Sequence, residues 1–220
     1  MSPRRAKVLS EHGTADSPGA LRRHLIAVTQ HLVAAHGLTG LTTRKIAREA
    51  QVADGVLYNH FADKNDLVAA ALAERAAALV ADFLAARPEP GTATLDENLA
   101  VLARATLTFN EGIVPLVTGL LGHPALLHGF FGGIHAGQSG PQTAYTSVIE
   151  YVRAEQRLGR ASGDVDAGAI AELLFGACQL RAIMALTAPQ ADGSDVGAAG
   201  TAEAYAVVAV LVRALRPTPS

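Results

Sequence analysis

Residues 41–64, LTTRKIAREAQVADGVLYNHFADK, combine two short apolar ridges with many basic and hydrogen-bonding side chains. Thr42 is a favourable helix N-cap, and the helix that follows it is expected to include Ile46 and Ala50. After a short turn, Asp54 is expected to cap a second short helix. Two short helices joined by a turn of three or four residues form a helix-turn-helix. In DNA-binding units of this kind the second helix lies in the major groove.

The two faces of this segment differ in chemistry. The side chains expected to face the core are Ile46, Ala47, Ala50, Val52, Leu57 and Phe61. Those expected to face outward are Thr43, Arg44, Asp54, Gly55, Tyr58, Asn59 and His60. Hydroxyl groups suit phosphate oxygens, while Arg and Asn can form paired hydrogen bonds with guanine and adenine. Each residue alone also has a structural explanation, such as a solvated helix face or a core aromatic, so it is the combination that indicates DNA binding.

Helical spacing of apolar residues continues on both sides of this segment, and no run alternates as a strand would. Pro115, Gly122 and Pro124 are expected to break the chain into short pieces up to about residue 140. Longer helices are expected at residues 21–36, 42–50, 64–87, 95–110, 142–158, 166–186 and 202–215, with Asp63 capping the third of these. The sequence therefore predicts an all-α fold. We expect a polar arm at 1–19, a DNA-binding domain at 20–66, and a helical ligand-binding and dimerisation domain at 67–220.

The composition narrows the class of protein. Half of the 220 residues are hydrophobic and 17% are charged, which indicates a globular protein. The single cysteine excludes an intrachain disulfide and is compatible with a reducing compartment. The long uncharged run at 112–149 is interrupted by Pro, Gly and His, so we expect no membrane span and a cytoplasmic location. Residues 1–67 hold nine Lys and Arg against six Asp and Glu, whereas the rest holds nine against fourteen, which favours a polyanion partner for the front.

Several elements together resemble the TetR family of transcriptional regulators over about residues 21 to 72. GLTTRKIAREA is followed by VLYNHFADKNDLVAAAL, with Thr42 before the second helix and the run Leu57-Tyr58-x-His60-Phe61. Lys64 opens the next helix. The resemblance implies a non-enzymatic regulator that binds a palindromic operator as a homodimer and responds to a small molecule, with repression more usual than activation.

The resemblance also implies individual roles. Thr43, Tyr58, His60 and Lys64 match positions that usually contact phosphates, and Arg44, Gly55 and Asn59 match positions that approach bases. Thr42 and Asp54 complete the expected DNA-binding set, Asp54 as a cap or as an acceptor from a cytosine amino group. Gln51 departs from the family pattern, which has Gly in the turn. A left-handed backbone there would cost Gln about 1 kcal/mol, so the turn either differs in geometry or is strained.

The rear of the chain holds aromatic and aliphatic residues that could enclose a mostly apolar ligand. The expected ligand-binding residues are Phe109, Val114, Leu116, Leu121, Phe130, Phe131, His135 and Tyr145. Each of them could equally be part of the core. The three histidines of this region have irregular spacing and no nearby carboxylate, so we expect no metal site and no cofactor.

Two late helices are expected to form a four-helix dimer interface with a second copy. The expected interface residues are Ile170, Leu173, Leu174, Ala177 and Leu186 on one helix and Tyr205, Val208, Leu211, Val212 and Leu215 on the other. The alternative is that both helices pack inside the monomer. Two further classes stay open at this point: an all-α enzyme, although no G-x-S-x-G elbow is present, and a helical partner-binding protein.

Overall fold

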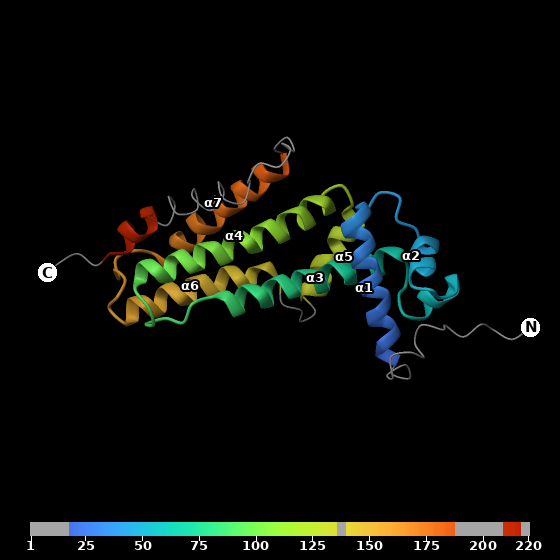
Figure 1. Cartoon of the computed structure of the whole chain (residues 1–220), viewed down its shortest axis with the longest axis horizontal. Helices are drawn as coiled ribbons and strands as arrows, with labels where there is room; N and C mark the ends of the chain where they lie inside the picture. The colour runs from blue at the N-terminus through green and yellow to red at the C-terminus, as the bar shows by residue number, and fades with distance from the viewer. Residues whose placement is uncertain (1–17, 136–139, 188–208, 217–220) are drawn as a thin grey trace, which may run out of the picture. The chain divides into compact units, whose positions relative to one another are not determined.

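The computed structural model describes residues 18–135, 140–187 and 209–216. All regular elements in these ranges are helical, which confirms the all-α prediction (Figure 1). The elements are α1 (Pro18–His36), α2 (Thr43–Glu49), the 3-10 helix η2 (Asp54–Asn59), α3 (Lys64–Ala86), α4 (Leu95–Leu120), α5 (Pro124–His135), α6 (Pro141–Arg157) and α7 (Ala167–Thr187). A further helix covers 209–215. Most of the predicted arm and the first part of the predicted last helix lie outside the described residues.

Side-chain caps fix the starts of two helices at the predicted residues. The hydroxyl oxygen of Thr42 accepts a hydrogen bond from the Lys45 amide at 3.2 Å, which opens α2. The carboxylate of Asp63 accepts from the Asp66 amide at 2.8 Å, and Asp66 accepts in return from the Ala62 amide at 2.9 Å. Such reciprocal bonds satisfy backbone donors that have no partner inside the helix. The predicted caps at Thr42 and Asp63 are therefore confirmed.

The fourth long helix extends further than its sequence indicates. The expected end near Asn110 and break at Pro115 are wrong, because α4 continues to Leu120. A proline inside a helix removes one intrahelical hydrogen bond and normally kinks or ends the helix. Here Ile113 and Val114 next to it are 6% and 5% exposed, so burial of this segment offsets the loss. Pro124 does mark a boundary, since it opens α5, where its missing N–H has no intrahelical role.

The described chain divides into two compact units. The first contains the described residues up to Arg75 together with those from Thr118 to 135, and the second contains Ala76–Val117 with the described residues from 140 onward. Compactness does not test where the binding functions lie, so the predicted functional boundary between residues 66 and 67 stays a prediction.

The core of the first unit holds α2 and η2 against α1. Helix α1 contributes Leu25, Ile26 and Leu32, and α2 contributes Ile46 and Ala47, all at most 3% exposed. Two further buried side chains, Leu57 and Phe61, complete this core. The predicted inner face is thus buried, although Val52 and Val56 are only half-buried.

An aromatic cluster and a buried carboxylate organise the second unit. Phe83, Phe109 and Phe175 contact one another with ring centroids 5.7 to 6.2 Å apart, and Tyr145 stands 5.5 Å from Phe175. Distances of this size and inclined ring planes suit the quadrupoles of aromatic rings. The cluster fills the interior between α3, α4, α6 and α7.

The buried carboxylate is Glu155, which is inaccessible to solvent. Its Oε2 lies 2.9 Å from Nε of Arg160, and its Oε1 accepts from the Tyr151 hydroxyl at 2.7 Å and from the Gly91 amide at 3.1 Å. Arg160 also donates to the carbonyl of Thr92. Burial, followed by the hydrogen bond to Glu155, raises the pKa of Tyr151 above its usual range. Through these contacts, Glu155 and Arg160 fix the loop before α4 to the end of α6.

Within the described residues, two helices, α4 and α7, are long and apolar enough to cross a membrane by length and composition alone. Half of the most apolar window of α4 is buried in the protein, as expected of a core helix. Only 28% of the corresponding window of α7 is buried, so much of its apolar surface faces outward.

Candidate nucleic-acid interface

The turn between α2 and η2 has the geometry of a Schellman cap. The amide of Val52 donates to the Ala47 carbonyl at 3.0 Å, and the amide of Gln51 donates to the Arg48 carbonyl at 3.2 Å. This pattern requires a left-handed residue after the C-cap, usually glycine. Gln51 occupies that position with a φ of 55°. Of the two possibilities raised by the sequence, the turn keeps the left-handed geometry and Gln51 carries the strain.

Two contacts from α1 support this turn and were not found from the sequence. The ring Nε2 of His24 lies 3.2 Å from the carbonyl oxygen of Ala50, which is the C-cap of α2. The guanidinium of Arg22 lies over the ring of Phe61, 5.0 Å from its centroid. In the sequence, His24 lies at the edge of the apolar stripe of α1, next to Leu25. This position is the only sequence feature that could have indicated a contact between His24 and another helix. Both contacts hold α2 and the segment after η2 against α1.

The predicted outward-facing residues are mostly exposed. Tyr58 is 58% exposed, and Arg44, Asp54, Gly55 and Asn59 are exposed as well. The exposed tyrosine offers both an aromatic ring and a hydroxyl group to a binding partner. The remaining predicted residues differ: Thr43, His60 and Lys64 are half-buried, and Thr42 is exposed but uses its hydroxyl as a cap.

Asp54 does not have its predicted structural role. The residue before η2 that serves as its N-cap is Ala53, with no side-chain cap hydrogen bond, so the expected capping by Asp54 is wrong. The 3-10 helix η2 begins at Asp54 itself, one residue earlier than a helix capped by Asp54 would. Instead, Oδ2 of Asp54 lies 3.6 Å from Nε of Arg44. The structure therefore brings together two of the predicted DNA-binding residues as an exposed ion pair.

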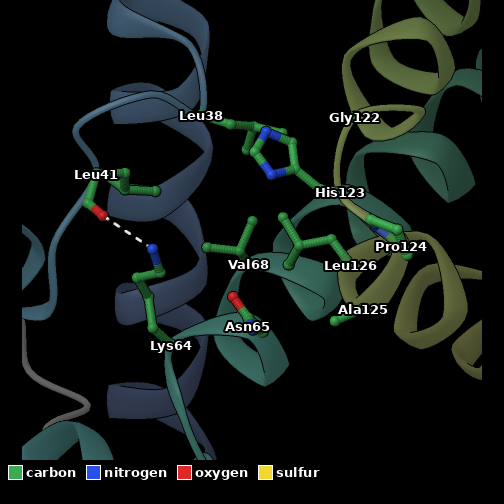
Figure 2. Close-up of a pocket in the computed structure, with 10 residues that line it drawn as sticks. All are labelled: Leu38, Leu41, Lys64, Asn65, Val68, Gly122, His123, Pro124, Ala125 and Leu126. Atoms are coloured by element: carbon green, nitrogen blue, oxygen red, sulfur yellow. Dashed lines mark hydrogen bonds between the residues drawn. The ribbon is translucent and has the colours of Figure 1, made fainter.

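Lys64 lies at the edge of a cavity of about 240 Å³ in the first unit (Figure 2). Its ammonium donates to the carbonyl oxygen of Leu41 at 3.2 Å, which joins the start of α3 to the loop before α2. The cavity is lined by Leu38, Leu41, Lys64, Asn65, Val68, Gly122, His123, Pro124, Ala125 and Leu126. The lysine thus fixes the helix-turn-helix in place and keeps further N–H donors for another partner.

The predicted ligand-binding residues divide between the two units and do not line one described pocket. Phe109, Val114, Leu116 and Tyr145 belong to the second unit, whereas Leu121, Phe130, Phe131 and His135 belong to the first. The side chain of His135 lies outside the described residues, and Leu121 is 66% exposed. Phe130 is fully buried, which is the core role that the sequence left open.

A groove of about 240 Å³ between α3 and α4 adjoins the aromatic cluster of the second unit. Its floor is apolar and includes Phe83 and Phe109, while Asp82 and Arg104 are exposed at its sides. The full lining is Leu79, Asp82, Phe83, Ala86, Val101, Arg104, Ala105, Thr108 and Phe109. Of the predicted ligand residues, Phe109 lies in this groove.

Half of the predicted dimer residues are buried within the single chain. Ile170, Leu174, Leu211, Val212 and Leu215 are at most 7% exposed, so these side chains have little surface left for a second copy. Leu173 and Leu186 are 59% and 51% exposed, Ala177 is half-buried, and Tyr205 and Val208 lie outside the described residues. The exposed apolar face of α7 consists of Leu173, Leu180, Ile183, Met184 and Leu186. A helical repeat of three to four residues predicts two faces on such a helix, but sequence alone does not say which one is inside.

Among the described residues, no group of three His, Cys, Asp or Glu side chains could hold a metal ion. Cys178 is buried, and burial raises the pKa of its thiol to about 11, so it is a poor nucleophile at neutral pH.

The N-terminal region of this chain is similar in sequence to a known family, and the fold of the whole chain is similar to solved structures. Residues 25–71 match the family model described as bacterial regulatory proteins, tetR family. No curated protein matches the chain. A structure from Rhodococcus sp. RHA1, a protein with unknown function, is 26% identical and has a TM-score of 0.64, with 92% of this chain and 99% of that chain covered.

Two other solved structures share the fold at lower identity. One is a putative TetR-family transcriptional regulator from Mesorhizobium loti, 17% identical, with a TM-score of 0.67 and coverage of 90% of this chain and 98% of that chain. The other is FadR from Bacillus subtilis in complex with stearoyl-CoA, 16% identical, with a TM-score of 0.60 and coverage of 88% and 99%. The family match includes α2, the strained turn and η2. Residues 25–71 are thus identified as a helix-turn-helix region of the tetR family, and the described chain as a whole shares its all-α fold with these solved structures.

Proposed function

We propose that this chain is a TetR-family transcriptional regulator and not an enzyme, that it represses transcription by binding a palindromic operator as a homodimer, and that a small, mostly apolar ligand releases it. The observation that carries the proposal is the chemistry of α2 and η2, where Arg44, Tyr58 and Asn59 are exposed while Ile46, Ala47 and Leu57 are buried. Activation of transcription by the same fold is the alternative. A transcriptional regulator binds DNA inside the cell, and we therefore propose that this protein is cytoplasmic.

Phosphate contacts are assigned to side chains with hydroxyl, imidazole or ammonium donors. These are Thr43, Tyr58, His60 and Lys64. Base contacts are assigned to Arg44, Gly55 and Asn59, because Arg and Asn recognise guanine and adenine through paired bonds and glycine permits close approach. Thr42 contributes by capping α2. Residues 20–66 would then hold the DNA-binding function, and residues 67–220 the ligand and dimer functions.

The groove beside the aromatic cluster supports the ligand assignment. Its floor offers Phe83 and Phe109, and Arg104 at its side offers a cation for a polar end group. A volume of about 240 Å³ lies just below the roughly 300–1,000 Å³ usual for ligand sites. A ligand acts on DNA binding only through different affinities for the competent and incompetent states.

The exposed apolar face of α7 supports the dimer assignment. Leu180, Met184 and Leu173 are 56 to 62% exposed, and burial of such a face between two copies is favourable by roughly 25 cal/mol per Å². A dimer would also present two copies of η2 to half-sites about 34–36 Å apart on one face of DNA. The ligand would then change the spacing between the two copies.

The test is DNA binding by the purified chain. Fluorescence anisotropy with a duplex from its own promoter region is expected to show tight binding that weakens steeply with salt, because basic residues release counterions from phosphates. Lys64→Ala is expected to lower the salt slope by about 0.9 for each protomer bound, and Tyr58→Phe to weaken binding to all sequences equally. If the promoter duplex binds no better than a shuffled duplex at any salt concentration, the proposed function is refuted.

A further inference from the structure

A negatively charged side chain lies on the face that the proposed function turns toward DNA. Asp54 is 62% exposed at the start of η2, and Arg44 in the first turn of α2 is 89% exposed. Asp54 caps no helix, and a carboxylate near phosphates weakens DNA binding. Its presence therefore needs a reason other than the stability of η2.

The geometry of the ion pair gives that reason. Oδ2 of Asp54 approaches Arg44 at Nε, at 3.6 Å, and not at the end of the guanidinium. The two terminal amino groups of Arg44 are the donors that read O6 and N7 of guanine in the paired mode. A contact through Nε restrains the side chain but leaves this fork for a base.

The strength of the pair also suits such a role. An exposed pair at this separation is weak and easily displaced. Because it uses Nε, the pair can persist while the two terminal amino groups make a paired, charge-assisted contact with guanine, whereas a phosphate contact that turns the guanidinium away from Asp54 breaks it. The pair therefore penalises non-operator DNA more than operator DNA.

We propose that Asp54 is a positioning residue for Arg44 that determines specificity: it orients the guanidinium toward a base and withholds it from phosphates of non-operator DNA. This inference rests on the proposed function, since it requires that α2 and η2 face DNA. The same residue would repel phosphates that approach η2 in a wrong register.

The test compares Asp54→Asn with Glu49→Gln, a matched change of one charge. Glu49 is an exposed carboxylate at the end of α2, and no ion pair to Arg44 involves it among the described residues. Kd is measured by anisotropy for an operator duplex and a non-operator duplex at the same salt concentration, in the wild type and in an Arg44→Ala background. Circular dichroism and thermal melting check that each variant is folded.

Asp54→Asn is expected to tighten non-operator binding about two- to fivefold, as loss of a weak exposed pair permits. Operator binding should stay equal or weaken, so the specificity ratio falls. Glu49→Gln should lower the Kd for both duplexes by the same factor. In the Arg44→Ala background, Asp54→Asn should likewise change both Kd values by the same factor. The inference is overturned if Asp54→Asn shifts both duplexes equally with Arg44 present. Failure of the wild type to distinguish the duplexes would instead overturn the proposed function.

Discussion

Replacement of Gln51 by glycine tests the strained turn directly. Gln51 has a φ of 55° at the position of a Schellman cap where a side chain is unfavourable. A left-handed backbone costs a residue with a Cβ roughly 1–2 kcal/mol. Glycine gives back about 0.4–1 kcal/mol through the greater entropy of its unfolded chain. Gln51→Gly should therefore stabilise the protein by about 0.5–1 kcal/mol, or about 1–4 °C in Tm for a chain of this size.

Urea unfolding at a fixed protein concentration is the assay, because the stability of the proposed dimer depends on protein concentration. Both cap hydrogen bonds of the turn come from backbone amides, so they persist in the variant. Gln51→Ala is the control: it removes the exposed amide group but keeps the Cβ, and it should give no gain. If glycine and alanine give the same midpoint as glutamine, the turn carries no strain and the reasoning is refuted.

Three further changes probe other parts of the molecule. The pKa of Tyr151 is raised, so the folded state holds the tyrosine proton more tightly than the unfolded state does. The free energy of unfolding should therefore fall as pH rises above about 10. In urea unfolding between pH 9 and 11, Tyr151→Phe should show a flatter dependence of this free energy on pH, and an unchanged dependence would contradict this cause. Leu180→Glu on the exposed face of α7 should convert the proposed dimer to monomer in light scattering, while Gln142→Glu on exposed α6 should leave it intact; a Leu180→Glu variant that is still dimeric would exclude this face of α7 from the interface. Thr42→Ala should cost about 1 kcal/mol through loss of the cap to Lys45, and a cost near zero in thermal unfolding would show that the cap is dispensable.

Local signals in the sequence predicted much of the front unit. Thr42, Asp63 and the turn at Gln51 follow rules that involve only a few neighbouring residues, and the structure has all three. The predicted cap at Asp54 is wrong, because a 3-10 helix begins at Asp54 and Ala53 is its N-cap. The N-cap residue can be predicted from the sequence only when the type of the helix that follows, α or 3-10, is known.

What the sequence did not predict depends on packing over long distances. Pro115 lies inside α4 because its buried neighbours keep the helix together, which propensity alone does not report. On α7, Leu174 is buried while Leu173 is exposed, and a helix of apolar residues gives no sign of which face is inward. The contact between His24 and Ala50 joins residues 26 positions apart and has no local pattern.

In the proposed function, the exposed end of η2 at Asn59 reads bases. Selection of preferred duplexes from a random pool, by the wild type and by Asn59→Ala, tests this claim directly. An amide that pairs with adenine contributes about 1–3 kcal/mol of discrimination at one base pair. We expect Asn59→Ala to relax the preference at one position, repeated symmetrically in both half-sites. An unchanged preferred sequence, with overall affinity alone reduced, would contradict the account.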